Sequence, residues 1–167
     1  ALYPALVLSS VYLMPEGLYT LLAVLALLLV GHRSLGIAAA AGAVAGMAML
    51  TRSVGVTLVV VAAAVQAWTV VTSAAAAKVA GARLAVFVGA CALVLAPWLL
   101  FTTRVAGGPL LDTTSGMNVL LGNHAGATGR LDMADDLPLR QAHVFGAASE
   151  ADANARALRA GVAWAVN

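Results

Sequence analysis

Residues 84–101 read LAVFVGACALVLAPWLLF, a run of eighteen residues without a charged side chain. An α-helix rises about 1.5 Å per residue, so this run approaches the thickness of the hydrocarbon core of a bilayer. Pro97 and Trp98 lie near its end, where an interfacial tryptophan is common in membrane helices. The run therefore predicts a membrane-spanning helix that ends near residue 101.

Similar charge-poor runs precede it at residues 2–31, 35–50 and 54–73. The tripeptide Pro15-Glu16-Gly17 interrupts the first run, because proline inside a helix removes one backbone hydrogen bond and disturbs another. A single helix over residues 35–73 would be about 58 Å long, which exceeds the bilayer thickness. The chain is therefore expected to turn near Arg52.

These runs predict an all-α fold. We expect a polytopic transmembrane helix bundle in residues 1–101, followed by an extracytoplasmic region of loops and helices in residues 102–167. Gly42 and Gly46 have the small-xxx-small spacing that lets the backbones of transmembrane helices approach closely. We expect helix packing at this motif.

The composition supports an integral membrane protein, because 62% of residues are hydrophobic and only 10% are charged, against about 25% charged in soluble domains. The sequence pI is near 9.1, yet the basic residues form no stripe, so nucleic acid is not expected as a partner. Cys91 is the single cysteine, which excludes a disulfide within the chain. The start without Met suggests an internal fragment of a longer protein.

Five charged residues in the first 101 set the expected orientation. Basic residues in short loops favour the cytoplasm, which places Arg33, Lys78 and Arg83 on that side. Counting spans then puts Glu16, Arg52 and everything after residue 101 on the extracytoplasmic side. The expected location is the plasma (inner) membrane, with several passes.

Three charged residues are candidates for binding a substrate. Glu16 is the only acid in residues 1–101, and a carboxylate in or near a membrane is usually paired or faces a wet cavity. Arg52 offers a planar fork that binds phosphate with two hydrogen bonds. Arg104 follows the last span. Simpler roles remain open: Glu16 can reach water, and both arginines can anchor lipid headgroups.

Residues 112–129 combine glycines with Thr, Ser and Asn, including Asn118 and Asn123. Such residues supply tight turns and the neutral hydrogen bonds that sugars need, although an ordinary polar loop has the same composition. No Walker or dinucleotide motif is present. The acidic residues after it lack the spacing of a calcium loop, so we predict no metal site; these are Asp132, Asp135 and Asp136.

Two further features lie in residues 102–167. His124 and His143 lack a partner at metal-ligand or catalytic spacing, and we assign neither a catalytic role. Residues 147–166 have the pattern of an amphipathic helix that packs on the membrane or on another domain.

Taken together, several short motifs resemble the middle of GT-C-type polytopic membrane glycosyltransferases, the group that holds protein mannosyltransferases and aminoarabinose transferases. In order, the motifs are Pro4-Ala5-Leu6, Pro15-Glu16-Gly17-Leu18-Tyr19, Leu50-Thr51-Arg52-Ser53-Val54-Gly55, Ala96-Pro97-Trp98, Gly116-Met117-Asn118-Val119-Leu120-Leu121-Gly122-Asn123 and Gly126-Ala127-Thr128-Gly129. Pro15 and Ser53 depart from the residues that are commoner in this group.

The resemblance implies transfer of a sugar from a polyprenyl-phosphate carrier to an acceptor on the extracytoplasmic side. Arg52 and Arg104 would hold the carrier phosphate, and Glu16 would orient an arginine or the acceptor. Asn118 and Asn123 would help close the sugar or acceptor cavity. The family's catalytic acids are expected upstream of Ala1, so the catalytic residues of this reaction are not assigned here.

The expected partners are the lipid bilayer, the lipid-linked sugar donor and an acceptor that is a glycan, a lipid or a protein. No cofactor is predicted beyond the donor itself. Two other functions remain open from the residues alone. Broken helices with a charge at the break also occur in transporters and flippases, and a Glu–Arg pair can simply hold helices together in an assembly subunit.

Overall fold

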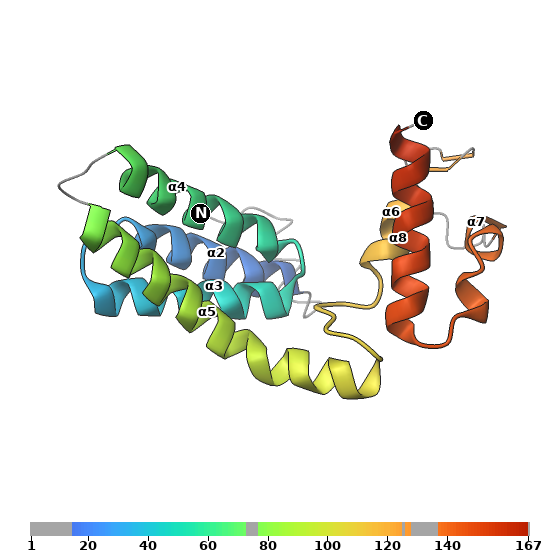
Figure 1. The fold of residues 1–167 in the computed structure, drawn as a ribbon, viewed down its shortest axis with the longest axis horizontal. Helices are drawn as coiled ribbons and strands as arrows, with labels where there is room; N and C mark the ends of the chain where they lie inside the picture. Colours follow the sequence, from blue (N-terminus) through green and yellow to red (C-terminus); the bar gives the residue numbers. More distant parts are fainter. Residues whose placement is uncertain (1–14, 73–76, 125, 128–136, 167) are drawn as a thin grey trace. The chain divides into compact units, whose positions relative to one another are not determined.

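The computed structural model describes residues 15–72, 77–124, 126–127 and 137–166. Within these ranges the chain is all-α, as predicted, with seven α-helices and one 3-10 helix (Figure 1). The elements are α2 (Pro15–Val30), α3 (Leu35–Thr51), α4 (Gly55–Thr72), α5 (Ala77–Val105), α6 (Ser115–Gly122), α7 (Leu137–Gln141), η1 (Val144–Gly146) and α8 (Glu150–Val166).

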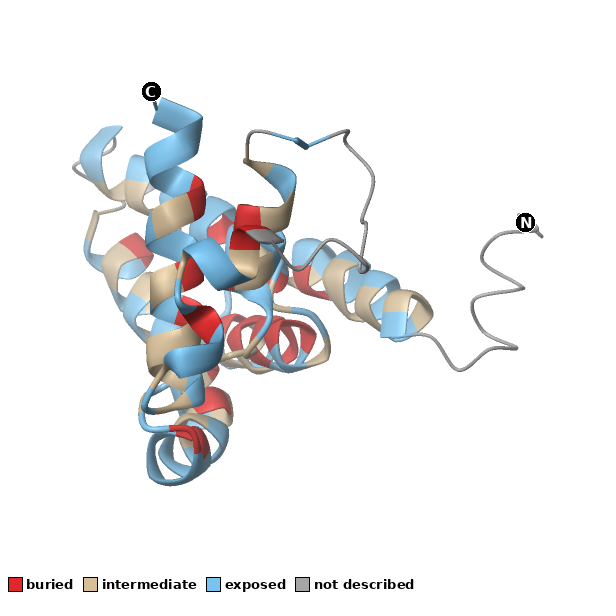
Figure 2. Cartoon of the chain, turned by 90° about the vertical axis from the view of Figure 1, so that its right-hand side faces the viewer, coloured by how far each residue is buried: buried red, intermediate tan, exposed pale blue. Residues whose placement is uncertain are grey.

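The chain forms two compact units, Ala1–Pro97 and Trp98–Asn167, which we call the first and second units. Helices α4 and α5 are long and apolar enough to cross a membrane, while α2 and α3 are apolar but shorter. Buried residues form narrow strips along the helices, between broad exposed areas (Figure 2). In the first unit the exposed areas are rich in large apolar side chains such as Leu28, Val71 and Leu93.

Small residues build the core of the first unit. Ala41 and Ala45 of α3 are completely buried and pack in one cluster with Phe87 of α5. The small-xxx-small prediction is confirmed, because Gly42 and Gly46 lie against the backbone of α5 near Phe87 and Cys91. These contacts also fix direction: α3 and α5 run parallel, while α2 and α4 are antiparallel to α3 across short turns (Figure 1).

The first unit therefore has two chemically different ends. The Glu16 end holds the start of α2 and the turn between α3 and α4, which contains Arg52. The Val30 end holds the end of α2, the turn with His32 and Arg33, and the start of α5. The turn near Arg52 was predicted, and residues 2–14 of the first predicted run lie outside the described residues.

Helix α5 is longer at both ends than the predicted segment 84–101. Its N-terminal extension carries Lys78 and Arg83, and the Arg83 guanidinium donates to the carbonyl oxygen of Val30 at 3.0 Å. Its C-terminal extension carries Arg104 and ends at Val105, and Gly107 follows with a φ of 81°, which suits a glycine that terminates a helix.

In the second unit α6 packs along α8 through small residues (Figure 1). Asn154, Ala157 and Gly161 lie on one buried face of α8, at the spacing of successive helical turns. Leu120 joins Ala157 and Val144 in a small core. Residues 115–122 form a helix where the sequence pattern suggested a polar loop, and Gly116 serves close packing there: a Cβ would lie 2.1 Å from the Asn154 carbonyl oxygen.

Candidate functional site

Glu16 and Arg52, two of the predicted substrate-binding residues, form an ion pair. Arg52 Nη1 donates to Glu16 Oε1 across 36 residues of sequence. Each side chain is about 40% exposed, with values of 41% for Arg52 and 40% for Glu16. The pair therefore lies at the surface of the first unit, accessible to a ligand.

Local structure positions Arg52 at the end of α3. Its backbone is extended, with φ of −149° and ψ of 128°, while its N–H still donates to the Ala48 carbonyl oxygen. The Gly55 N–H donates to the Arg52 carbonyl oxygen at 2.9 Å, which closes the turn into α4. A Cβ on Gly55 would lie 2.9 Å from the backbone of Met49. The turn that holds Arg52 thus requires glycine at this position.

Both residues of the pair have hydrogen-bonding groups that the ion pair does not use. Glu16 Oε2 is buried and has no hydrogen-bond partner among the described residues, so one acceptor of this carboxylate is not satisfied by that part of the chain. Glu16 is also the only ion-pair partner of Arg52 in that part of the chain. Since guanidinium carries five N–H donors, Arg52 retains donors for an anion such as phosphate.

The other predicted residues belong to the second unit. Arg104 is exposed in the last turn of α5, where a positive charge is favourable beside the helix C-terminus. Asn118 is exposed on α6. Asn123 follows α6, and its Nδ2 donates to the Val119 carbonyl oxygen at 2.8 Å. This hydrogen bond uses one donor of the Asn123 amide to satisfy a carbonyl oxygen at the end of α6.

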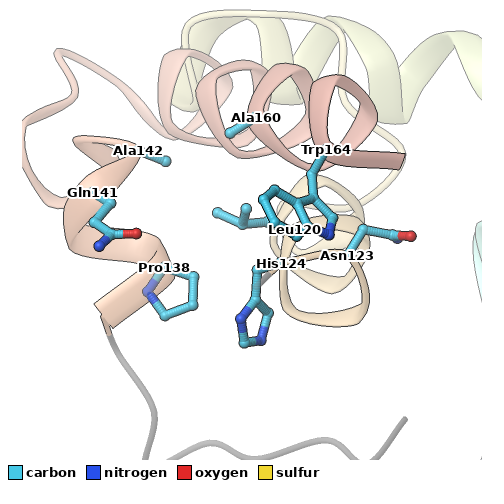
Figure 3. Close-up of a pocket in the computed structure, with 8 residues that line it drawn as sticks. All are labelled: Leu120, Asn123, His124, Pro138, Gln141, Ala142, Ala160 and Trp164. Carbon is cyan, nitrogen blue, oxygen red and sulfur yellow. The ribbon is translucent and has the colours of Figure 1, made fainter. Parts of the chain in front are cut away.

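Asn123 also borders a pocket of about 210 Å³ within the second unit. Gln141 extends from α7 toward the hollow, while Trp164 of α8 and His124 bound its other side (Figure 3). The Asn123 amide points away from Gln141 in the same view. The remaining walls are apolar and come from Leu120, Pro138, Ala142 and Ala160.

The polar groups of this pocket are neutral amides and an imidazole. His124 Nδ1 accepts the N–H of Gly126 at 3.1 Å, so Nε2 carries the proton in the neutral tautomer and acts as a donor. Sequence patterns did not indicate Gln141 or Trp164 as pocket residues, because they lie 18 and 41 residues from Asn123 in the chain. Asp132, Asp135 and Asp136 lie outside the described residues.

In the described ranges no group of three or more His, Cys, Asp or Glu side chains is placed to hold a metal ion. Comparison of the chain with models of protein families, with curated proteins and with solved structures finds no match. The site must therefore be interpreted from its own chemistry.

Proposed function

We propose that this chain is part of a membrane glycosyltransferase that moves a sugar from a polyprenyl-phosphate carrier to an acceptor on the extracytoplasmic side. The observation that carries the proposal is the exposed ion pair of Arg52 with Glu16 at one end of an apolar helical unit. The exposed apolar side chains of that unit support a bilayer around it.

In this reaction the bond between the sugar C1 and the carrier phosphate oxygen breaks, and a bond from C1 to the acceptor oxygen forms while the acceptor hydroxyl gives its proton to a carboxylate base. Negative charge develops on the departing phosphate. Arg52 stabilises that charge through its remaining N–H donors, and Glu16 holds the guanidinium in place through Oε1. Glu16 Oε2 is buried and lacks a partner in the described residues, so the acceptor hydroxyl is proposed to reach it only when the pair rearranges on binding.

The pocket of the second unit supports a sugar as the transferred group or part of the acceptor. The negative face of an indole attracts the weakly positive C–H bonds of a sugar ring, and Trp164 offers such a face (Figure 3). Gln141 and His124 add neutral hydrogen-bonding groups without a net charge. Arg104 and Asn118 are proposed as further contacts to the carrier phosphate and the sugar.

The mutual pairing of Glu16 and Arg52 also favours a second candidate, a subunit in which the pair only holds helices together. Charge reversal separates the two functions. Glu16→Arg combined with Arg52→Glu restores an ion pair, so it preserves folding in both cases. It places a carboxylate where the phosphate would bind, and transfer is then lost only if the pair serves the reaction.

The experiment uses the intact protein in proteoliposomes with a panel of labelled polyprenyl-phosphate-linked sugars. We expect transfer by the wild type from at least one donor, and at least about a hundredfold slower transfer by the charge-reversed variant. Arg33→Ala is the matched control, because Arg33 is an exposed arginine at the opposite end of the unit. Unchanged transfer in the charge-reversed variant would contradict the proposal.

A further inference from the structure

A second polar site lies at the Val30 end of the first unit, opposite the Glu16–Arg52 pair. It is a cavity of about 150 Å³ bordered by α2, α4 and α5. Its polar side chains are Gln66 of α4 and Arg83 of α5, and its apolar walls come from Val30, Gly31, Val65 and Ala80.

Gln66 is unusual for a residue in an apolar helix. It is only 5% exposed, and neither its Oε1 nor its Nε2 has a hydrogen-bond partner among the described residues. Leaving a buried amide without hydrogen-bond partners is unfavourable, because the amide loses its bonds to water and gains none in return. Because Gln66 lines the cavity, a molecule within it is the natural source of both missing hydrogen bonds.

Arg83 gives a second, independent indication. Its Nη2 donates to the carbonyl oxygen of Val30 at 3.0 Å, which satisfies a group at the end of α2 that lacks a helical partner. This capping does not account for Nε, which is buried and without a partner in the part of the chain that the structure describes. A donor of Arg83 is thus left beside the orphaned amide.

The charge balance of this end calls for an anion. The Arg83 guanidinium carries a positive charge, and Arg33 and Lys78 add positive charge near the same end. Glu16 is the only acid in residues 1–101, and it pairs with Arg52 at the other end. A partly buried cation without a counter-charge is unfavourable.

We propose that this cavity binds a phosphate group of the kind found in inorganic phosphate and in phosphate monoesters. An ionised carboxylate only accepts hydrogen bonds, whereas Gln66 also needs a donor for Oε1. A singly protonated phosphate has both accepting oxygens and one O–H, and about a tenth of a phosphate monoester is in this form at pH 7 because its second pKa is about 6. Arg83 supplies the charge, and Gln66 supplies the matching donor and acceptor.

The phosphate can come from solution or from the headgroup of a lipid. The site differs from the proposed carrier site in position and residues, so its test is independent of the transferase proposal. We would measure the thermal midpoint of the intact protein in an uncharged detergent, with inorganic phosphate or with mixed micelles that contain phosphatidic acid. A ligand that binds only the folded state raises this midpoint.

We expect a raised midpoint with at least one probe. A rise with inorganic phosphate indicates a site for the free anion, and a rise with phosphatidic acid alone indicates a lipid headgroup. Arg83→Gln should weaken the affinity about tenfold or more, since it removes a charged hydrogen-bond donor. Lys78→Gln is the control, because it removes an exposed positive charge near the same end that does not line the cavity.

Gln66→Leu is a second cavity variant, which tests the proposal even if Arg83→Gln fails to fold. Replacing an unsatisfied amide by an apolar group of similar shape is neutral or stabilising, so this variant should fold without the probe and lose the response to it. Absence of a shift with both probes would overturn the proposal, as would a shift that survives in both cavity variants. A shift that is lost only in Lys78→Gln would also overturn it, since it would indicate surface charge alone.

Discussion

Gly42 of α3 lies directly against Phe87 of α5: a Cβ built on Gly42 would be 2.1 Å from the Phe87 carbonyl oxygen. Two helices therefore meet backbone to backbone at this point, with Phe87 only 1% exposed beside it. Close approach of this kind strengthens packing where both helices are surrounded by apolar solvent. It makes Gly42 a sensitive position in the first unit.

Gly42→Ala is expected to lower the free energy of unfolding by about 1–3 kcal/mol, since the added methyl group forces the helices apart. Gly89→Ala is the matched control, because a Cβ there has no neighbour within 4 Å, and alanine favours the helix by up to about 1 kcal/mol. Denaturant unfolding in detergent, followed by circular dichroism, measures both. Equal stabilities of the two variants would contradict the packing described here.

Asn154 of α8 holds α6 in place in the second unit through a hydrogen bond. Its Oδ1 accepts the N–H of Gly116 at 2.7 Å in a buried position. Asn154→Ala leaves that N–H without an acceptor and should cost about 1–3 kcal/mol. Hydrogen exchange of the α6 amides should accelerate accordingly. The exposed Asn118→Ala should change stability by no more than about 0.5 kcal/mol, and a similar effect of both variants would refute this assignment.

Asp152 should make the start of α8 sensitive to acid. The hydrogen bond from Arg156, at 2.7 Å, holds the pKa of this carboxyl below its usual range, and the Ala148 N–H adds to the effect. A carboxyl with a lowered pKa stabilises the fold above its ordinary value of about 3.9, and this contribution is lost as the pH falls through the lowered pKa.

The midpoint of thermal unfolding of the protein, followed between pH 6 and pH 2, measures this contribution. Asp152→Asn should lower the midpoint at pH 6, and the difference from the wild type should shrink as the pH falls below about 4. Arg156→Met should behave in the same way, because it removes the main cause of the lowered pKa. A difference that is independent of pH in both variants would disprove the role of this pair.

Gly55 should control activity through the position of Arg52. A Cβ on Gly55 would meet the backbone of Met49 at 2.9 Å, so Gly55→Ala displaces the turn that carries the guanidinium. We expect about tenfold slower transfer or more, because small displacements of a positioning group are costly. Gly31→Ala changes a glycine in another turn with open space around it. Its rate, normalised to folded protein, should match the wild type.

Charge and hydropathy were sufficient to predict the helical class and the turn near Arg52. Runs without charge indicate helices directly, and a turn is required where a run exceeds the bilayer thickness. The same patterns could not predict the full length of α5. Lys78 and Arg83 lie outside the charge-free run, and the hydrogen-bond partner of Arg83 is Val30, 53 residues away.

The site was predicted less completely. Counting spans placed Glu16 and Arg52 on one side, but their direct contact depends on the turn at Gly55. Gln141 and Trp164 were missed because a pocket between α7 and α8 is defined only by packing, with no local motif. Gln66 is a polar residue in an apolar run, yet only burial distinguishes it from a surface residue.

The central claim is that Arg52 stabilises the phosphate of a polyprenyl carrier during sugar transfer. The most direct measurement is the initial rate of transfer from a labelled polyprenyl-phosphate-linked sugar by the intact protein in proteoliposomes. We predict that Arg52→Ala lowers this rate about a hundredfold or more, while Arg33→Ala leaves it unchanged. Equal rates for the wild type and Arg52→Ala would contradict the claim.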